Sequence, residues 1–410
     1  MKLGSLFDGS GGFPLGGIIA GMTPVWSSEI EPFPIRVTEK RLPSVRHYGD
    51  VSKLNGAGLE PVDVITFGSP CQDMSVAGKR AGLDGARSGL FFQAVRIIKE
   101  MRAKYGKPRY AVWENVRGAL SSAGGEDFRR VLEELCRIKD DAVDVPRPPK
   151  GKWQSAGRVM GDGYSIAWRV LDAQYWGVPQ RRKRIYLVAD FDGDSAGKIL
   201  FESEGVSGHS EKMQAARKDF ARTAQNSAGE TGWGKEVLND QGGSAISVEH
   251  DLSPTLPAET HQHLPIVYGP TSPDDLYLMS KSYHFAHATP DQADALVATD
   301  YKCPPIVNAD WRVRMITPLE CARLQGFPDW WTDNLTDSEP SDAEVRKWQG
   351  IFDEYCDING KKRKTASQVR KWLMTEPTDA AKYKMWGNGV ALPCVVFVLA
   401  GIMWEAGEDL

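Results

Sequence analysis

The sequence lacks the cysteine and hydrophobic patterns that mark several common classes of protein. Its six cysteines include no C-x-x-C pair, which excludes the usual spacings of zinc sites and of disulfide frameworks. The longest apolar run, Val395 to Trp404, falls short of the about 20 residues that a membrane span needs. The chain turns acidic at Asp8, too early for a secretory leader. We therefore expect a soluble, reduced, cytoplasmic protein without a metal site or a membrane partner.

An excess of positive charge is also lacking. Lysine and arginine number 50 against 54 aspartates and glutamates, so the net charge is −4. This excludes a polycation that coats nucleic acid, and any nucleic-acid surface must be a local basic cleft. A calcium loop is excluded as well. The segment Asp357–Gly360 resembles part of one, but its first and twelfth ligand positions would be Tyr355 and Ala366.

In the first 190 residues, short apolar segments alternate with amphipathic ones. This alternation predicts an α/β fold with a doubly wound, mostly parallel, Rossmann-like sheet, whose ligands lie at the carboxyl ends of the strands. The predicted strands are Lys2–Phe7, Pro24–Ser28, Val62–Phe67, Tyr110–Trp113, Ile166–Leu171 and Arg184–Ala189. The predicted helices are Gly12–Ala20, Pro34–Arg41, Leu90–Tyr105 and Phe128–Lys139. Proline and glycine predict a long inserted loop at Asp140–Gly163.

The rest of the chain has a different composition. From about Asp192 to Asn308 it is polar and irregular, with short β-like segments that indicate a smaller β-rich domain. Within it, two segments form a weak repeat: Thr255–Val267 and Ala295–Val307. The repeat is explained either by two matched β units or by chance similarity. Residues 333–379 are charged and helix-prone, and an apolar helix is predicted at about Pro393–Trp404.

A glycine-rich turn follows the first predicted strand and precedes a helix. Glycines at Gly9, Gly11 and Gly12 let backbone amides approach a ligand closely. Pro14 breaks the G-x-G-x-x-G spacing, which disfavours a nicotinamide or flavin site. Glu29 ends the second strand, where a carboxylate can bind ribose hydroxyls, and Asp50 could accept from an adenine amine. The alternative is a tight turn without a ligand, but the two carboxylates favour nucleoside binding.

Two further strands are followed, and a third is preceded, by side chains that can take part in chemistry. Cys71 follows Pro70 and precedes a loop with four glycines and three cations, Glu114 follows an apolar strand, and Arg181–Arg184 precede one. The alternatives are an inert buried cysteine, a structural salt bridge and a solvated turn.

Together the three groups fit methyl transfer to carbon 5 of cytosine. That carbon becomes nucleophilic only when a thiolate adds to C6. A carboxyl group must hold the proton at N3 while charge builds on the ring. Cationic side chains would fix the ring oxygen and a backbone phosphate.

At these residues the chain resembles the DNA (cytosine-5)-methyltransferase family over most of its length. Six segments, in the order of the family, are similar to its motifs: Phe7–Gly12, Pro70–Gln72 with Ser75, Glu114–Val116, Gln180–Arg184, Arg314–Pro328 and Gly387–Val390. The fifth is a near-complete match. Asp8 stands where alanine is more usual, and Gly389 replaces a usual serine.

The resemblance implies a reaction and its site. Cys71 would be the nucleophile and Glu114 the acid, with Asn115 shaping the turn that presents Glu114, and Arg182 and Arg184 would complete the catalytic set. S-adenosylmethionine would be the methyl donor. Its predicted contacts are Phe7, Asp8, Gly9, Gly11, Gly12, Phe13, Glu29, Ile30, Asp50, Val51, Pro70 and Asn388.

The resemblance also implies a domain plan and partners. Residues 1–191 would form the catalytic domain, 192–310 the target recognition domain and 311–332 a bridge between them, with 333–379 an insertion and 380–410 returning to complete the catalytic domain. The expected partner is double-stranded DNA, bound by a monomer, with a restriction endonuclease acting separately as a possible second partner. Two rival interpretations are a tRNA cytosine methyltransferase and a DNA-binding protein that has lost catalysis.

Overall fold

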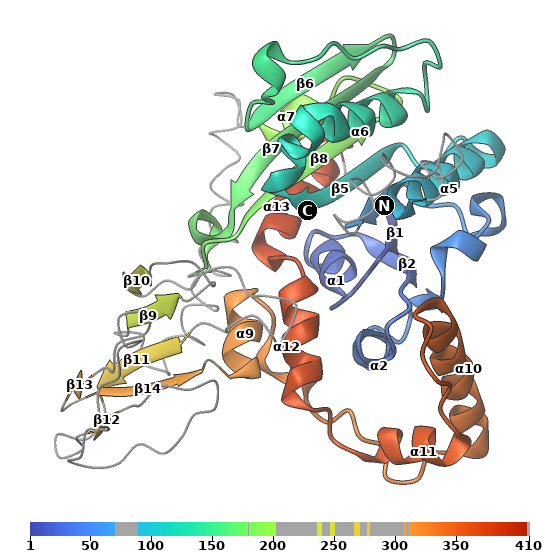
Figure 1. Ribbon diagram of the computed structural model, residues 1–410. Coiled ribbons are helices and arrows are strands. Elements are labelled where there is room, and N and C mark those ends of the chain that lie inside the picture. Colours follow the sequence, from blue (N-terminus) through green and yellow to red (C-terminus); the bar gives the residue numbers. More distant parts are fainter. Residues whose placement is uncertain are drawn as a thin grey trace.

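The computed structural model describes residues 1–69, 89–178, 180–201 and 317–407. Between the last two ranges it describes the backbone of six short strands. A single eight-stranded sheet forms the centre of the molecule, in the order β3-β2-β1-β4-β5-β8-β7-β6 (Figure 1). Its strands are β1 (Lys2–Leu6), β2 (Thr23–Ser28), β3 (Arg46–Tyr48), β4 (Val64–Phe67), β5 (Tyr110–Val116), β6 (Ala156–Gly161), β7 (Tyr164–Asp172) and β8 (Lys183–Asp190).

The sheet is parallel from β3 to β5 and antiparallel from β5 to β6. Its central strands are apolar on both faces because both faces are covered, as in other α/β sheets. Trp113 on one face of β5 packs in a cluster with α5 (Leu90–Tyr105) and α6 (Glu126–Cys136). Its neighbour Val112 packs on the other face with α13 (Leu392–Glu405). The predicted doubly wound, mostly parallel sheet is confirmed.

One predicted loop is wrong. Asp140–Gly163 was expected to be irregular, but Ala156–Gly161 forms β6 and pairs antiparallel with β7. The two strands are joined by a tight turn at Asp162 and Gly163, where Gly163 has a φ of 69°. An Asp-Gly pair between two alternating segments is a hairpin signal, so the sequence did contain the information.

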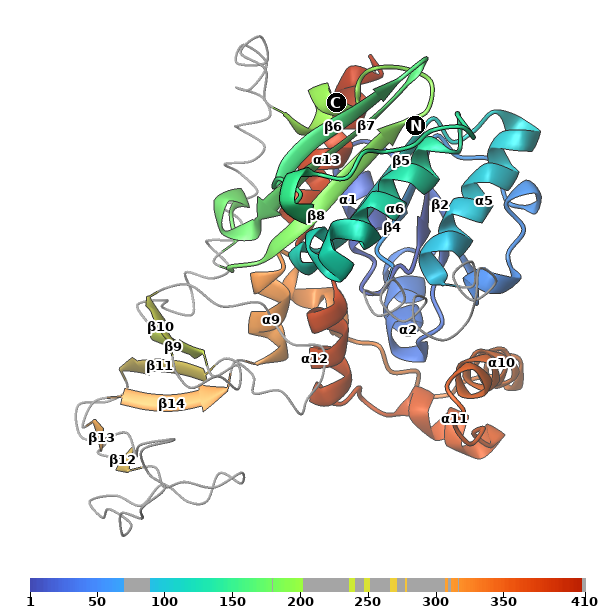
Figure 2. The same cartoon turned by 45° about the horizontal axis from the view of Figure 1, so that its top comes forward.

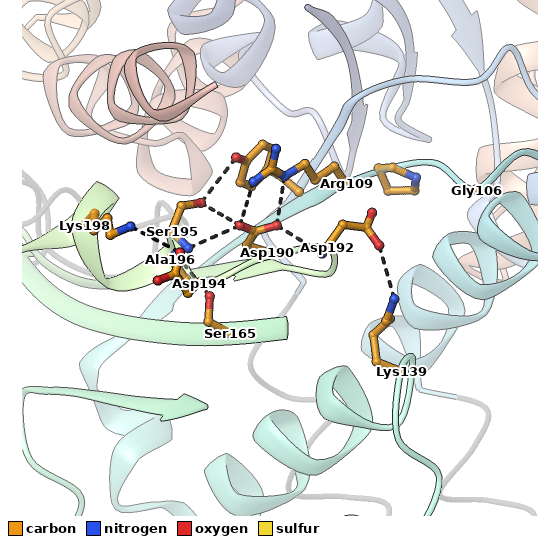
Figure 3. A network of polar contacts seen from close by, with 12 residues as sticks. Gly106, Arg109, Lys139, Ser165, Asp190, Asp192, Asp194, Ser195, Ala196 and Lys198 are labelled. Carbon is orange, nitrogen blue, oxygen red and sulfur yellow. Dashed lines mark hydrogen bonds and ion pairs between the residues drawn. The ribbon is translucent and has the colours of Figure 1, made fainter. Parts of the chain in front are cut away.

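The second domain starts later than position 192. Helix α7 (Ala196–Leu200) packs with β7, β8 and α13, so it belongs to the catalytic domain. Figure 3 shows how it is held at the end of β8. The buried Asp190 carboxylate accepts hydrogen bonds from Ser195 Oγ at 2.6 Å and Arg109 Nε at 3.0 Å. The catalytic domain therefore extends at least to Leu200.

The smaller domain contains a four-stranded sheet in the order β10-β9-β11-β14 and a two-stranded sheet of β12 and β13. Their bounds are β9 (Glu236–Asn239), β10 (Ser247–His250), β11 (Ile266–Pro270), β12 (Tyr277–Leu278), β13 (Val307–Asn308) and β14 (Trp311–Met315). The repeat predicted from the sequence lies mostly outside the described residues. Its two ends fall in β11 and β13, which belong to different sheets.

The C-terminal quarter is helical and returns to the central sheet (Figures 1 and 2). The predicted charged insertion contains α10 (Asp342–Ile358) and α11 (Ala366–Met374). Each begins with a capping box, from Ser341 and Thr365 respectively. The other α-helices in the described part of the catalytic domain are α1 (Gly12–Ile19), α2 (Pro32–Arg41), α9 (Pro318–Leu324) and α12 (Asp379–Asn388).

The terminal helix α13 packs against α1 and β5, and nearly all of its apolar side chains are buried. Among the described residues, no single helix is long and apolar enough to cross a membrane. Only the bent pair α12 and α13 passes that test together, by length and composition alone.

Candidate active site

The carboxylate of Glu114 is buried at the end of β5. The strand continues to Val116, so Glu114 lies within it rather than just after it. Burial raises the pKa of Glu114, although the guanidinium groups of Arg184 and Arg182 act in the opposite direction. Arg184 Nε lies 3.2 Å from Glu114 Oε1. This contact is an ion pair without an aligned hydrogen bond, since Oε1 has no hydrogen-bond partner among the described residues. A raised pKa suits a group that must carry a proton near neutral pH.

The two arginines of the predicted catalytic set differ in position. Arg184 lies beside Glu114. Arg182 was expected to point toward a ligand, but it is 3% exposed and donates to the carbonyl of Gly389. Burial lowers the pKa of Arg182 to about 9. Its guanidinium group is therefore buried near Glu114 and Arg184. It connects the residue before β8 to Gly389, which follows Asn388.

The segment that leads to Cys71 begins against Glu114. A Cβ built on Gly68 would lie 3.5 Å from Glu114 Oε2. The next residue, Ser69, is fixed by both neighbours of Glu114. Trp113 Nε1 donates to Ser69 Oγ at 3.1 Å, and Asn115 Nδ2 donates to the Ser69 carbonyl at 2.9 Å. Asn115 thus joins the ends of β4 and β5. It lies within β5, so the prediction that it shapes a turn presenting Glu114 is wrong.

Cys71 and Pro70 lie outside the described residues, so their predicted roles stay predictions. Ser69 and Trp113 were not singled out in the sequence. A tryptophan in an apolar strand indicates core packing, and only the pairing of β4 with β5 places its indole nitrogen beside Ser69.

A second group of predicted residues meets at the ends of β1 and β2. The Glu29 carboxylate accepts from the backbone nitrogens of Gly9 at 2.8 Å, Ile30 at 2.7 Å and Glu31 at 2.9 Å. Burial raises the pKa of Glu29, and these hydrogen bonds oppose the rise. They fix the carboxylate at the sheet edge and leave acceptor positions for hydroxyl groups of a ligand.

The turn after β1 has the backbone expected of a close ligand contact. Phe7 has a φ of 57°, and Gly9 and Gly11 have φ values of 55° and 80°. A positive φ at a bulky residue such as Phe7 is rare and typical of functional sites. Gly12 is packed so closely that a Cβ there would lie 2.4 Å from Val390 Cγ2.

Asp8 is buried in this turn. Ser5 Oγ donates to its Oδ1 at 2.8 Å, and its Oδ2 has no hydrogen-bond partner among the described residues. Burial raises the pKa of Asp8 to about 7, and the nearby Glu29 adds to the effect.

The remaining predicted cofactor residues differ in how far their side chains are exposed. Phe7, Ile30 and Asp50 are partly exposed and Asn388 is exposed. Phe13 is 2% exposed and packs in the core with α13, which favours a packing role over contact with a ligand. Val51 is buried at the start of a short 3-10 helix, η1 (Val51–Lys53), which Asp50 caps by accepting from Ser52 N at 2.8 Å. Within the described ranges, no cluster of three histidine, cysteine or acidic side chains could hold a metal ion.

The chain matches the C-5 cytosine-specific DNA methylase family over residues 1–138 and 158–347. The chain belongs to this family. The resemblance recognised in the sequence is thereby confirmed, and family membership implies S-adenosylmethionine as the methyl donor.

Curated relatives of this chain come from phages and bacteria. It is 29% identical to a protein of Escherichia phage P1 named DNA N-6-adenine-methyltransferase, over 92% of this chain and 58% of that protein. It is 33% identical to the type II methyltransferase M.NgoBV of Neisseria gonorrhoeae, over 40% of this chain and 33% of that protein. The chain thus spans less than two thirds of the length of these relatives.

A solved structure supports the fold. The methyltransferase EhMeth of Entamoeba histolytica aligns over 100% of this chain and 99% of its own, with a TM-score of 0.52 and 12% identity. At this identity, the similarity shows a shared fold, that is, a shared arrangement of the sheet and its helices.

Proposed function

We propose that this methylase transfers a methyl group from S-adenosylmethionine to carbon 5 of cytosine in double-stranded DNA, through a covalent bond from Cys71 to C6. One observation carries the proposal. The buried acid Glu114, with its raised pKa, lies against Gly68 and is flanked by the two residues that fix Ser69. Ser69, two residues before Cys71 in the sequence, therefore lies beside Glu114. This proximity suits an acid and a nucleophile that act on the same ring.

The residues around Glu29 fit the cofactor. A fixed carboxylate at the carboxyl end of the second strand is suited to ribose hydroxyls, and the positive-φ turn from Phe7 to Gly11 exposes backbone to a ligand. When bound, the cofactor supplies an electrophilic methyl group on its sulfonium. Phe7, Gly9, Glu29, Ile30, Asp50 and Asn388 would hold it, since these are the accessible members of the predicted set among the described residues.

The proposed reaction begins when the target cytosine is flipped out of the DNA stack. The thiolate of Cys71 bonds to C6, and the electron pair of the C5–C6 bond becomes available at C5. Glu114 keeps a proton at N3, which neutralises the charge that would otherwise build on the ring. Carbon 5 would then bond to the methyl group as the carbon–sulfur bond of the donor breaks. A base would remove the C5 proton, and the released electron pair would re-form the double bond and expel Cys71.

Side chains at the same sheet edge are suited to nucleic acid. The exposed Arg181 and Lys183 lie just before and at the start of β8, close in sequence to Arg184, and the 3-10 helix η6 (Ala173–Trp176) directly follows β7, the partner of β8. Tyr175 in η6 is 80% exposed. Cations that pair with phosphates and an aromatic ring that can stack on a base are the usual elements of such surfaces. We infer that the DNA lies along this edge and that residues 202–316 read its sequence, in the cytoplasm of a bacterial or phage-infected cell.

A second candidate function follows from the phage relative, whose name describes methylation of adenine N6. An exocyclic amine needs neither a thiolate addition nor an acid that protonates the ring. Glu114 with a raised pKa beside Arg184 is the arrangement that a C6 addition requires, so it favours cytosine. A separately acting endonuclease stays a prediction, since the relatives include both type II and orphan methyltransferases.

Product analysis tests the proposal. The protein is incubated with S-adenosylmethionine and unmethylated DNA or tRNA, and the digested nucleosides are separated by mass spectrometry. We expect 5-methylcytosine from DNA, and a loss of more than about tenfold in turnover for Glu114→Gln. Glu60→Gln, at an exposed glutamate that pairs with Lys2 far from the site, should retain full activity. N6-methyladenine as the product, or 5-methylcytosine in tRNA alone, would contradict the proposal.

A further inference from the structure

We propose that the helices α10 and α11 form a support for the loop Gly49–Lys53 and position Asp50 for the adenine ring of S-adenosylmethionine. The inference rests on the proposed function and gives a role to the charged insertion, which the sequence left unexplained. In both views α10 and α11 lie beside α2, at the opposite end of the molecule from the sheet of β9, β10, β11 and β14 (Figures 1 and 2). Because α2 begins at Pro32, three residues after Glu29, α10 and α11 lie on the side of the proposed cofactor residues.

A buried arginine of α2 fastens the insertion. Arg36 is 4% exposed, and its guanidinium donates to the carbonyls of Leu335 at 2.7 Å, Leu373 at 2.6 Å and Trp372 at 2.9 Å. Two of these carbonyls belong to the last turn of α11, where the helix leaves acceptors without partners and carries partial negative charge. The ring of Trp372 also lies 4.6 Å from the guanidinium carbon. The insertion is thus fixed to the catalytic domain.

The fastened helix α10 contacts the loop that holds Asp50. Glu354 of α10 accepts from Lys53 Nζ at 2.7 Å. Its carboxylate also lies against Gly49, since a Cβ built there would be 2.0 Å from Glu354 Oε2. On the other side, the carbonyl of Gly49 accepts from Ser28 Oγ at 2.6 Å, one residue before Glu29. The loop is therefore held between the end of β2 and α10.

The neighbouring loop has a similar support. Glu31 follows Glu29 by two residues and pairs with Lys384 of α12 at 2.5 Å. Lys361, just after α10, donates to Tyr355 at 2.9 Å and lies close enough to Glu31 for their charges to interact. Helix α12 thus contacts the loop of Glu31, with Lys361 of the insertion close by, and α10 of the insertion contacts the loop of Asp50.

The chain provides a matched control. Lys347 of α10 pairs with Glu39 of α2 at 2.7 Å, the same distance as the Lys53–Glu354 pair, but touches neither loop. Both lysines are mostly exposed, so each pair contributes only modestly. Lys53→Met should raise the Kd and KM for S-adenosylmethionine about three- to fivefold, with kcat at saturating cofactor unchanged. Lys347→Met should leave all three values unchanged.

A double-mutant cycle gives the decisive test. Gly49 does not have a positive φ, so its backbone conformation accepts an alanine, and the three atoms nearest to the added Cβ all belong to the Glu354 carboxylate. Gly49→Ala should weaken cofactor binding about tenfold, by calorimetry, with the melting temperature of the apoprotein nearly unchanged. Adding Glu354→Ala should restore the affinity to that of Glu354→Ala alone, because the obstacle is gone.

The outcomes separate the inference from the function on which it rests. If the unaltered protein does not bind S-adenosylmethionine, the proposed function fails. If it binds but Gly49→Ala keeps the same Kd, or if Lys347→Met weakens binding as much as Lys53→Met, only the inference is overturned. A Gly49→Ala defect that Glu354→Ala does not relieve would overturn it too.

Discussion

At the residue scale, the site depends on how burial and charge act together on single carboxyl groups. Burial raises the pKa of Glu114, and the two nearby guanidinium groups limit the rise. Arg184 favours the ionised form of Glu114, and in the proposed reaction it would also donate to the ring oxygen of cytosine. The protonation of the acid is set by its neighbours rather than by glutamate chemistry alone.

Replacing Arg184 should shift the pH profile of the reaction. Arg184 lowers the pKa of Glu114, so Arg184→Gln should raise it, and Glu114 would stay protonated to higher pH. We expect the alkaline limb of the kcat/KM profile to move to higher pH, while the plateau falls about tenfold or more because a cationic ligand of the ring is lost. Lys183→Gln, at the exposed neighbour, should leave the limb in place. A limb that moved to lower pH in Arg184→Gln would contradict the assignment of Glu114.

Asp8 should make stability depend on pH in an unusual direction. Its pKa in the folded protein is raised to about 7 from 3.8, so the folded state holds its proton more tightly than the unfolded state. Its contribution is fully favourable below 3.8 and is lost as the pH rises to about 7. Asp8→Asn should therefore gain stability relative to the natural protein between pH 5 and about 8, measured by urea unfolding. A relative loss over this range would contradict the raised pKa.

Some of these residue positions could be predicted and others could not. Glu114 and Glu29 follow from strand ends, because the carboxyl ends of parallel strands share an edge. The partner of Arg182 could not be predicted, since Gly389 lies 207 residues further along the chain. The same holds for Arg36, whose acceptors lie about 300 residues away. Such contacts depend on the path by which α12 and α13 return to the sheet.

At the element scale, the polar network at the end of β8 holds α7 in place (Figure 3). Asp190 pairs with Tyr110 at the beginning of β5, so the network lies at the end of the sheet opposite Glu114. Burial alone would raise the pKa of Asp190, but hydrogen bonds from Arg109 and Ser195 outweigh it and leave the pKa lowered. The network therefore supports the fold rather than the chemistry.

Asp190→Asn should destabilise the protein by about 2–3 kcal/mol at pH 7, because it replaces a carboxylate that accepts several charge-assisted hydrogen bonds. The advantage of the natural protein should disappear as the pH falls below 3.8, where the folded-state carboxylate becomes protonated. Chemical unfolding at pH 7 and pH 3 measures both values. A pH-independent difference would show that the charge of Asp190 contributes nothing.

Strands and helices were predicted best where they are long, buried and apolar. Helix α5 was predicted at its observed bounds. Its periodic apolar positions indicate the buried face of the helix, and Gly106 indicates its C-terminus. β6 was missed because it is an edge strand with half of its side chains exposed and with prolines and glycines before it. α7 was assigned to the wrong domain because a five-residue helix has no periodicity to read.

At the scale of the whole molecule, the chain leaves the catalytic domain after Leu200 and re-enters it at α9. The polar, irregular sequence between them contains a separate antiparallel sheet. The helix α9 packs with α12 and α2 around Trp331, so the re-entry point is anchored next to the cofactor-side loops. A segment bounded in this way can be exchanged without cutting the central sheet.

Exchanging residues 202–316 for the equivalent segment of a relative should change which cytosines are methylated, because side chains of that segment are proposed to contact base edges. The reaction itself should still require Cys71 and Glu114. Bisulfite sequencing of DNA from cells that express the chimera measures the target. A folded, active chimera that keeps the parental target would place recognition elsewhere in the chain.

The central claim is the covalent bond between Cys71 and C6, and a trapping experiment tests it most directly. DNA with 5-fluorocytosine at the target is incubated with the protein and S-adenosylmethionine, then denatured and separated by electrophoresis. Since fluorine cannot leave as a proton does, we predict a denaturation-resistant complex of protein and DNA that requires the cofactor and is absent for Cys71→Ser. A protein that methylates the unmodified target but forms no such complex, or a complex that persists in Cys71→Ser, would contradict the account.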